Sequence, residues 1–352
     1  MLIKRLFIIF SWVALIFTIL YFPNWKWISS REKTLNVFTW GDILEPSVIA
    51  QFEKETGIKI NLSYYSSNEE LIVKLKATEG FGYDLIIPSD YAVKALADEG
   101  LLKELDKNQL HFWKDINPLL LNHFFDSNNH FSIPFEWEVF GLGFDKDYDK
   151  KNPLASSWKM IFEPQGYNIA MLNDPIEVIA LTAFYLYQTV GFVNNQQIEE
   201  IKNLLIRQKK WVEAYASFRG DYFIATKNCP VVVSTSSYMR RSMNQFPFIG
   251  FMIPKEGTFI TIENLCIPKA SSKETLTYQF INYLFRYESI EKHYQTFGFF
   301  PSLLTHLDLI EKDPAIRKLV ISSPEDFKTY HFIQNIVSPQ TLHDMWIEIK
   351  TN

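Results

Sequence analysis

The chain has 352 residues, of which 47% are hydrophobic, 21% are charged and 16% are aromatic. This composition is typical of a folded globular protein with material for two domains, and it excludes a disordered or collagen-like chain. The formal net charge of −5 excludes the strongly basic surface of a nucleic-acid-binding protein.

Residues 1–30 differ from the rest of the chain. Lys4 and Arg5 precede an uncharged run from Leu6 to Phe22, which predicts an export signal or a short membrane anchor. No cleavage site of the small-x-small type follows, so a cleaved signal peptide and an N-terminal membrane anchor both stay open. Either one sends the rest of the chain across the membrane, because the basic end stays cytoplasmic. Without residues 1–30 the chain loses three basic residues and no acidic one, so its net charge becomes −8, which favours cationic partners.

Beyond this segment, short apolar strands alternate with amphipathic helices. In the first part of the chain we expect strands at 35–40, 57–65 and 83–88, and helices at 46–56, 68–79 and 91–99. Three strand–helix units in series imply a parallel sheet covered by helices.

A second set of elements follows in the same style. We expect strands at 167–172, 230–234, 248–254 and 259–267, and helices at 174–190, 195–215, 273–294 and 338–350. The fold class is therefore α/β, with two lobes. Ligands of such folds bind outside the carboxyl ends of the strands and in the crevice between lobes.

Acidic and aromatic residues gather where the predicted strands end. Trp40 and Asp42 follow the first strand, Ser89 and Tyr91 follow the third, and the strand at 259–267 carries a further acid. The members of this candidate site from the first lobe are Trp40, Asp42, Ser89, Tyr91 and Glu263. Carboxylates and aromatic faces together suit an ammonium ligand, since the acids neutralise the cation and the rings attract it.

Asp174 and Glu177 stand at the start of the helix at 174–190. Asp174 is placed to cap the helix, Pro175 suits its first turn, and Glu177 stands where a capping box has its acid. On spacing alone, capping is the more frequent role for this pattern. Asp42 and Asp90 are equally typical of helix caps or solvated loop acids, and Trp40 of a core residue.

The chain has no catalytic or cofactor motif. It contains no nucleophile elbow, P-loop, zinc-binding HExxH or dinucleotide-binding glycine fingerprint, and its seven His residues lack metal-ligand spacing. We therefore expect no catalytic residue, no metal and no cofactor. Cys229 and Cys266 both lie in apolar runs, which favours buried free thiols over a single disulfide.

From Leu35 onward the chain resembles the periplasmic spermidine/putrescine-binding proteins of ABC-type polyamine transporters. The matching stretches include LNVFTWGDILEPSVIAQFEKETGIKI, YDLIIPSDYAV, LNDPIEV and TFITIENLCIP. The resemblance implies a two-lobed periplasmic binding protein fold (type II-like), with residues 31–140 and 262–306 in one lobe and 141–261 and 307–352 in the other. It implies a monomer that captures putrescine or spermidine between its lobes and delivers it to inner-membrane permease subunits. The expected location is the periplasm or the outer face of the cytoplasmic membrane.

The resemblance also assigns site residues. Ligand-binding positions of the family fall on Trp40, Asp42, Ser89, Tyr91, Asp174, Glu177, Thr235, Thr261, Glu263, Phe299 and Gln334. Several of these depart from the family. Thr235 and Thr261 stand where the family has Trp, and Phe299 replaces a tyrosine. Asp42 replaces a Glu and Glu263 replaces an Asp. Glu136 and Glu138 add acid where the family is usually uncharged. These departures leave open a related receptor for another cationic or small solute.

Overall fold

The computed structural model describes residues 10–18, 33–216, 219–313, 316–317 and 327–352. Residues 10–18 are helical, and the rest of the predicted export signal lies outside the described residues. Among the residues described, no helix has both the length and the apolar character needed to span a bilayer.

The strands form one mixed sheet in the order β2-β1-β3-β9-β4-β7-β5-β6. Its strands are β1 (Thr34–Thr39), β2 (Lys59–Tyr64), β3 (Leu85–Ile86), β4 (Ser132–Asp145), β5 (Ile169–Met171), β6 (Val212–Tyr215), β7 (Val231–Thr235), β8 (Ile249–Met252), β9 (Thr258–Cys266), β10 (Phe300–Pro301) and β11 (Tyr330–Phe332). The predicted parallel pairing of the first units is confirmed, because β1 runs parallel to both β2 and β3. In the second half β5 runs parallel to β6 and β7.

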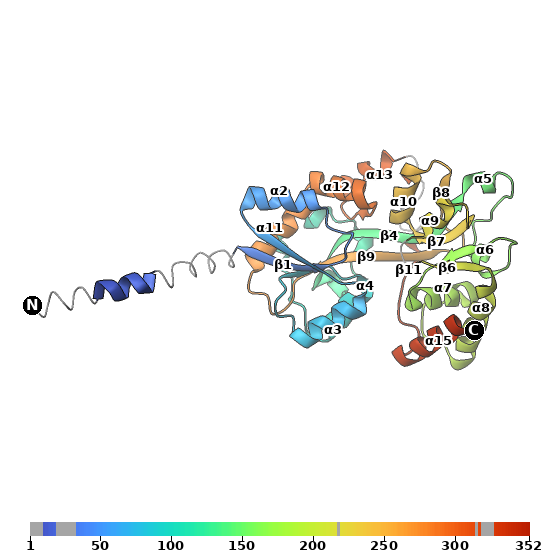
Figure 1. Cartoon of the computed structure of the whole chain (residues 1–352), viewed down its shortest axis with the longest axis horizontal. Helices are drawn as coiled ribbons and strands as arrows, with labels where there is room; N and C mark the ends of the chain where they lie inside the picture. The colour runs from blue at the N-terminus through green and yellow to red at the C-terminus, as the bar shows by residue number, and fades with distance from the viewer. Residues whose placement is uncertain (1–9, 19–32, 217–218, 314–315, 318–326) are drawn as a thin grey trace, which may run out of the picture.

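Two antiparallel strands, β4 and β9, connect the halves of the molecule. Figure 1 shows both running along the long axis, from the side of β1 to the side of β7. The first half of β4 pairs with β9, and its last residues pair with β7 and β8. The two lobes are thus joined by continuous strands, which is the arrangement of a hinge. The lobe limits given above stay a prediction.

Helices cover both faces of the sheet in each lobe (Figure 1). Those of the first lobe are α2 (Pro46–Thr56), α3 (Asn68–Thr78), α4 (Asp90–Asp98), α11 (Glu274–Leu284) and α12 (Tyr287–Phe297). The others are α5 (Lys146–Asp149), α6 (Lys159–Phe162), α7 (Pro175–Tyr187), α8 (Asn195–Gln208), α9 (Gly220–Ala225), α10 (Ser236–Gln245), α13 (Asp308–Glu311) and α15 (Pro339–Thr351). Helix α2 has the predicted bounds, with Pro46 in its first turn and Gly57 left-handed at its end (φ 70°).

Two predicted helices are wrong in part. The helix expected at 195–215 ends at Gln208, and residues 212–215 form β6 because their backbone pairs with β5. The helix expected at 273–294 is divided into α11 and α12 by Phe285 and Arg286. Phe285 stacks on Phe112 and the backbone of Arg286 is extended, so packing against a distant segment interrupts the helix.

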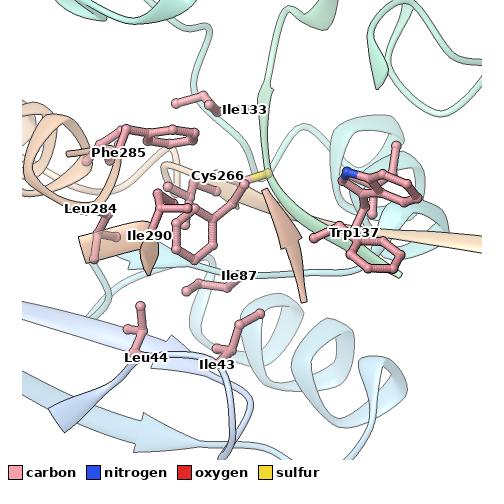
Figure 2. Packing of buried hydrophobic residues seen from close by; sticks show 14 of the residues in the cluster. Ile43, Leu44, Ile87, Ile133, Trp137, Cys266, Leu284, Phe285 and Ile290 are labelled. Atoms are coloured by element: carbon pink, nitrogen blue, oxygen red, sulfur yellow. The ribbon is translucent and has the colours of Figure 1, made fainter. Parts of the chain in front are cut away.

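The first lobe holds a large apolar core beneath α11 and α12. Figure 2 shows Ile87, Ile133, Trp137 and Cys266 in this core; Ile133 and Trp137 both belong to β4. The Trp137 indole is buried and donates a hydrogen bond to the Pro301 carbonyl (3.0 Å). The predicted thiols are confirmed as free and buried.

Candidate functional site

A cavity of about 480 Å³ lies at the ends of the strands, between the two lobes. The loop after β1 and the start of α4 form one wall, and the starts of α7 and α10 form the opposite wall. The hinge strands β4 and β9 form its floor through Glu138, Phe140, Thr261 and Glu263.

Ten of the eleven predicted site residues line this cavity. They are Trp40, Asp42, Ser89, Tyr91, Asp174, Glu177, Thr235, Thr261, Glu263 and Phe299. Gln334 is the exception, because the residue before it, Ile333, takes the place at the cavity wall. Successive side chains of an extended chain alternate in direction, so an offset of one residue is enough to move Gln334 away from the site.

Glu263 is held at the floor by two side chains of the first lobe. The Trp40 indole Nε1 donates to its Oε2 (2.9 Å) and the Ser89 hydroxyl donates to its Oε1 (2.8 Å). Ser89 occupies the N-cap position of α4 but makes no capping bond there, so its hydroxyl serves the site and not the helix. Burial, with the charges of Glu138 and Asp90 adding to it, raises the pKa of Glu263 to about 8.

Asp174 both caps a helix and faces the cavity. Its Oδ1 accepts hydrogen bonds from the backbone amides of Ile176 (2.8 Å) and Glu177 (3.1 Å), which confirms the capping interpretation. Burial raises the pKa of Asp174 despite these two bonds, and the charge of Glu69 adds to the rise. The two roles are compatible, because the start of α7 forms part of the cavity wall.

Glu177 behaves differently from a capping-box acid. Within the described part of the chain its carboxylate has no hydrogen bond back to the Asp174 amide and no ion pair. It borders the cavity, and burial raises its pKa well above the usual value, with the negative charges of Asp174, Glu138 and Glu69 adding to the effect. Such surroundings disfavour the charged form of a carboxylate, so a bound cation would stabilise Glu177 as an anion.

Two further acids, Asp42 and Asp90, differ in exposure. Asp90 is buried and accepts bonds from the amides of Tyr91 (2.7 Å) and Ile262 (3.3 Å), and burial raises its pKa to about 7. Asp42 is exposed at the rim, where its Oδ2 lies 3.7 Å from Nη1 of Arg241 on α10. Asp42 is thus a rim acid that faces the other lobe.

Aromatic side chains complete the walls. The rings of Trp40 and Tyr65 lie 4.5 Å apart, and the Tyr91 hydroxyl donates to Oε1 of Glu69 (2.9 Å). The sequence reasoning missed the lining residues Tyr65 and Tyr238. Tyr65 follows β2 and Tyr238 stands three residues after β7. The rule that sites gather at strand ends would therefore have found both.

The charge of the lining is one-sided. Six of its residues are acidic, namely Asp42, Asp90, Glu138, Asp174, Glu177 and Glu263, and among the described residues that line it none is Lys, Arg or His. Carboxylates that line one cavity disfavour one another's ionisation unless a positive charge is bound between them. The arrangement is therefore suited to a cationic solute.

Comparisons with known proteins agree with this geometry. Residues 47–318 match the profile of the bacterial extracellular solute-binding proteins. The chain belongs to this family. Its members are solute-binding receptors that act outside the cytoplasm, so the predicted function as a receptor and the predicted export are confirmed at this level.

Individual relatives of this solute-binding protein are named for polyamines. It is 28% identical to the spermidine/putrescine-binding periplasmic protein of Escherichia coli K12 over 90% of this chain and 91% of that protein. It is 29% identical to the E. coli putrescine-binding periplasmic protein PotF, over 74% of this chain and 75% of PotF. The predicted family resemblance is thereby confirmed.

The fold comparison confirms the two-lobed periplasmic binding protein fold. The spermidine/putrescine ABC transporter substrate-binding protein PotD of Streptococcus pneumoniae superimposes with a TM-score of 0.77, at 24% identity. The alignment covers 90% of this chain and 98% of PotD.

Proposed function

We propose that this solute-binding protein captures a polyamine in the cavity between its lobes and hands it to the permease of an ABC importer. The observation that carries the proposal is the lining of six carboxylates with no basic side chain among the described lining residues. Polyamines are chains of methylene groups between positively charged nitrogens, and such a ligand supplies the charge that this cavity lacks. The names of the relatives, which bind spermidine and putrescine, support the same ligand class.

The walls suit the rest of the ligand. Trp40 and Tyr65 present aromatic surface that can lie against methylene groups and attract an ammonium group at about 0.5–2 kcal/mol for each ring. A hydrogen bond from an ammonium to a carboxylate contributes about 1.5–3 kcal/mol. The volume of about 480 Å³ lies in the usual range for small-molecule sites.

Capture and closure are linked in this proposal. Glu263 belongs to β9 beside the first lobe, and Glu177 belongs to α7 in the second. A cation that contacts both stabilises the closed arrangement over an open one, because only the closed arrangement brings the two acids to the same ligand. The protein in this role binds and releases its solute without chemical change, acts as a monomer, and is soluble in the periplasm or held at the outer face of the cytoplasmic membrane.

Calorimetric titration of the full-length chain tests the ligand class. Putrescine, spermidine and spermine are titrated, with arginine and γ-aminobutyrate as a basic amino acid and a zwitterion of similar length. We expect micromolar or tighter binding of at least one polyamine and weaker binding of both amino acids, since their carboxylates meet the acidic wall. Failure of all three polyamines to bind refutes the proposal, and tight binding of arginine alone transfers the protein to the alternative class of receptors for other cationic solutes.

A further inference from the structure

Glu138 is one of the two acids on the floor of the cavity, together with Glu263. Glu138 lies on the hinge strand β4, directly opposite Thr261 on β9. Its side chain is 8% exposed, and both it and Thr261 line the cavity. The short side chain of Thr261, which is paired with Glu138, leaves the floor of the cavity open at that point.

The partners of Glu138 hold its carboxylate without neutralising it. The Ser237 hydroxyl donates to its Oε2, and Thr235 next to it shares a hydrogen bond with Ser237 (3.2 Å). The positive charge of Arg241 acts on Glu138 and opposes the rise of its pKa that burial causes. Its guanidinium is engaged elsewhere, 4.2 Å above the Tyr238 ring and 3.7 Å from Asp42, and Arg241 does not line the cavity.

Glu138 also acts electrostatically on acids of both lobes. Its charge contributes to the raised pKa of Glu177 in the second lobe and to that of Glu263 in the first. Glu138 thus lies within electrostatic reach of an acid from each lobe, as its position on the hinge strand also indicates.

We propose that Glu138 is a specificity-determining residue that binds an internal charged nitrogen of the ligand while Glu177 and Glu263 bind the outer ones. The site then prefers a triamine to a diamine. This inference rests on the proposed function and names the substrate class within it. A diamine supplies positive charge to two of the three acids and leaves the third without a charged partner in a buried place, which costs free energy.

The test compares spermidine, with three charged nitrogens, and putrescine, with two. The affinities of the full-length wild type, Glu138→Gln and Glu138→Asp are measured by calorimetry at pH 7.5. We expect the wild type to bind spermidine at least tenfold more tightly than putrescine. In Glu138→Gln we expect spermidine affinity to fall tenfold or more and putrescine affinity to fall less than threefold, with Glu138→Asp in between.

A matched control removes a charge away from the cavity. Glu104 is exposed and does not line the cavity, so Glu104→Gln should leave both affinities within twofold of wild type. Equal fold-changes for the two ligands in Glu138→Gln, or tighter binding of putrescine than of spermidine by the wild type, would overturn the role of Glu138. The ratio of the wild-type affinities for spermidine and putrescine needs no variant, so it tests the triamine preference even if a variant fails to fold. Absence of binding of either ligand to the wild type overturns the proposed function itself, which is a distinguishable result.

Discussion

The substitution Glu177→Gln separates a ligand contact from a structural role at the start of α7. The Glu177 carboxylate borders the cavity without a hydrogen bond or ion pair within the described residues, and burial together with neighbouring acids raises its pKa well above the usual value. The raised pKa favours the protonated state of the side chain in the unliganded protein. Gln has almost the same shape and no charge, so it reproduces that protonated state.

The expected effects follow from this protonation state. The free energy of unfolding of the unliganded variant at pH 7 should stay within about 0.5 kcal/mol of wild type, as for substitutions that break no packed contact. Polyamine affinity should fall by about 1.5–3 kcal/mol, the contribution of a hydrogen bond to a charged group, which is roughly 10- to 150-fold. Loss of affinity without loss of stability is the signature of a ligand contact.

Two measurements on the full-length chain check this expectation. Urea denaturation without ligand gives the unfolding free energy, and calorimetry with spermidine gives the affinity. Asp174→Asn is the companion variant, because Asp174 caps α7 through two backbone amides, although Asn also caps well and keeps much of that stability. A destabilised Glu177→Gln with unchanged spermidine affinity would refute the reasoning and restore the capping interpretation of Glu177.

The remaining predictions concern pH, backbone strain and thiols. The pKa of Glu263 is raised to about 8, so between about pH 4.5 and pH 8 this group binds more protons in the folded protein than in the unfolded chain. The melting temperature without ligand should therefore fall as pH rises through this window. Polyamine affinity should rise through the same window, because Glu263 becomes charged. Gly298→Ala should lower the unfolding free energy by more than Gly57→Ala. Both glycines have positive φ, which costs an alanine about 1–2 kcal/mol, but a Cβ at Gly298 would lie 2.6 Å from a backbone oxygen of α10, whereas one at Gly57 meets nothing. Equal losses of unfolding free energy in urea denaturation would contradict this. Cys229 and Cys266 are buried free thiols, so a thiol reagent should label both only after denaturation, and a reductant should leave the melting temperature unchanged.

Local signals in the sequence were sufficient for much of the fold. The bounds of α2 follow from Pro46 and Gly57, and the parallel units follow from the alternation of apolar strands and amphipathic helices. The same is true of the acids at the start of α7, because Asp174 and Glu177 follow a strand within a few residues. Residues at the carboxyl ends of neighbouring parallel strands meet at one edge of a sheet, so their convergence follows from chain order.

The hinge strand β4 had no such local signal. It is buried along almost its whole length, so its sequence lacks the alternation of a half-buried strand. It also contains three acids and two glycines, which are uncommon in strands. Both glycines are explained only by packing, because a Cβ at Gly141 would lie 2.5 Å from Phe251 and one at Gly143 would lie 2.2 Å from Met239.

The sequence by itself determined the class of fold, the family and an acidic site at the strand ends, because these depend on neighbours along the chain. Only the tertiary structure decided that β4 pairs first with β9 and then with β7 and β8, that Phe285 divides a helix, and that Glu138 meets Thr261 across the floor of the cavity. Such pairings join segments far apart in sequence, and their energy comes from contacts that no local pattern contains. The triamine preference that we propose rests on this last pairing, because Glu138 lies on β4 opposite Thr261 and lines the cavity.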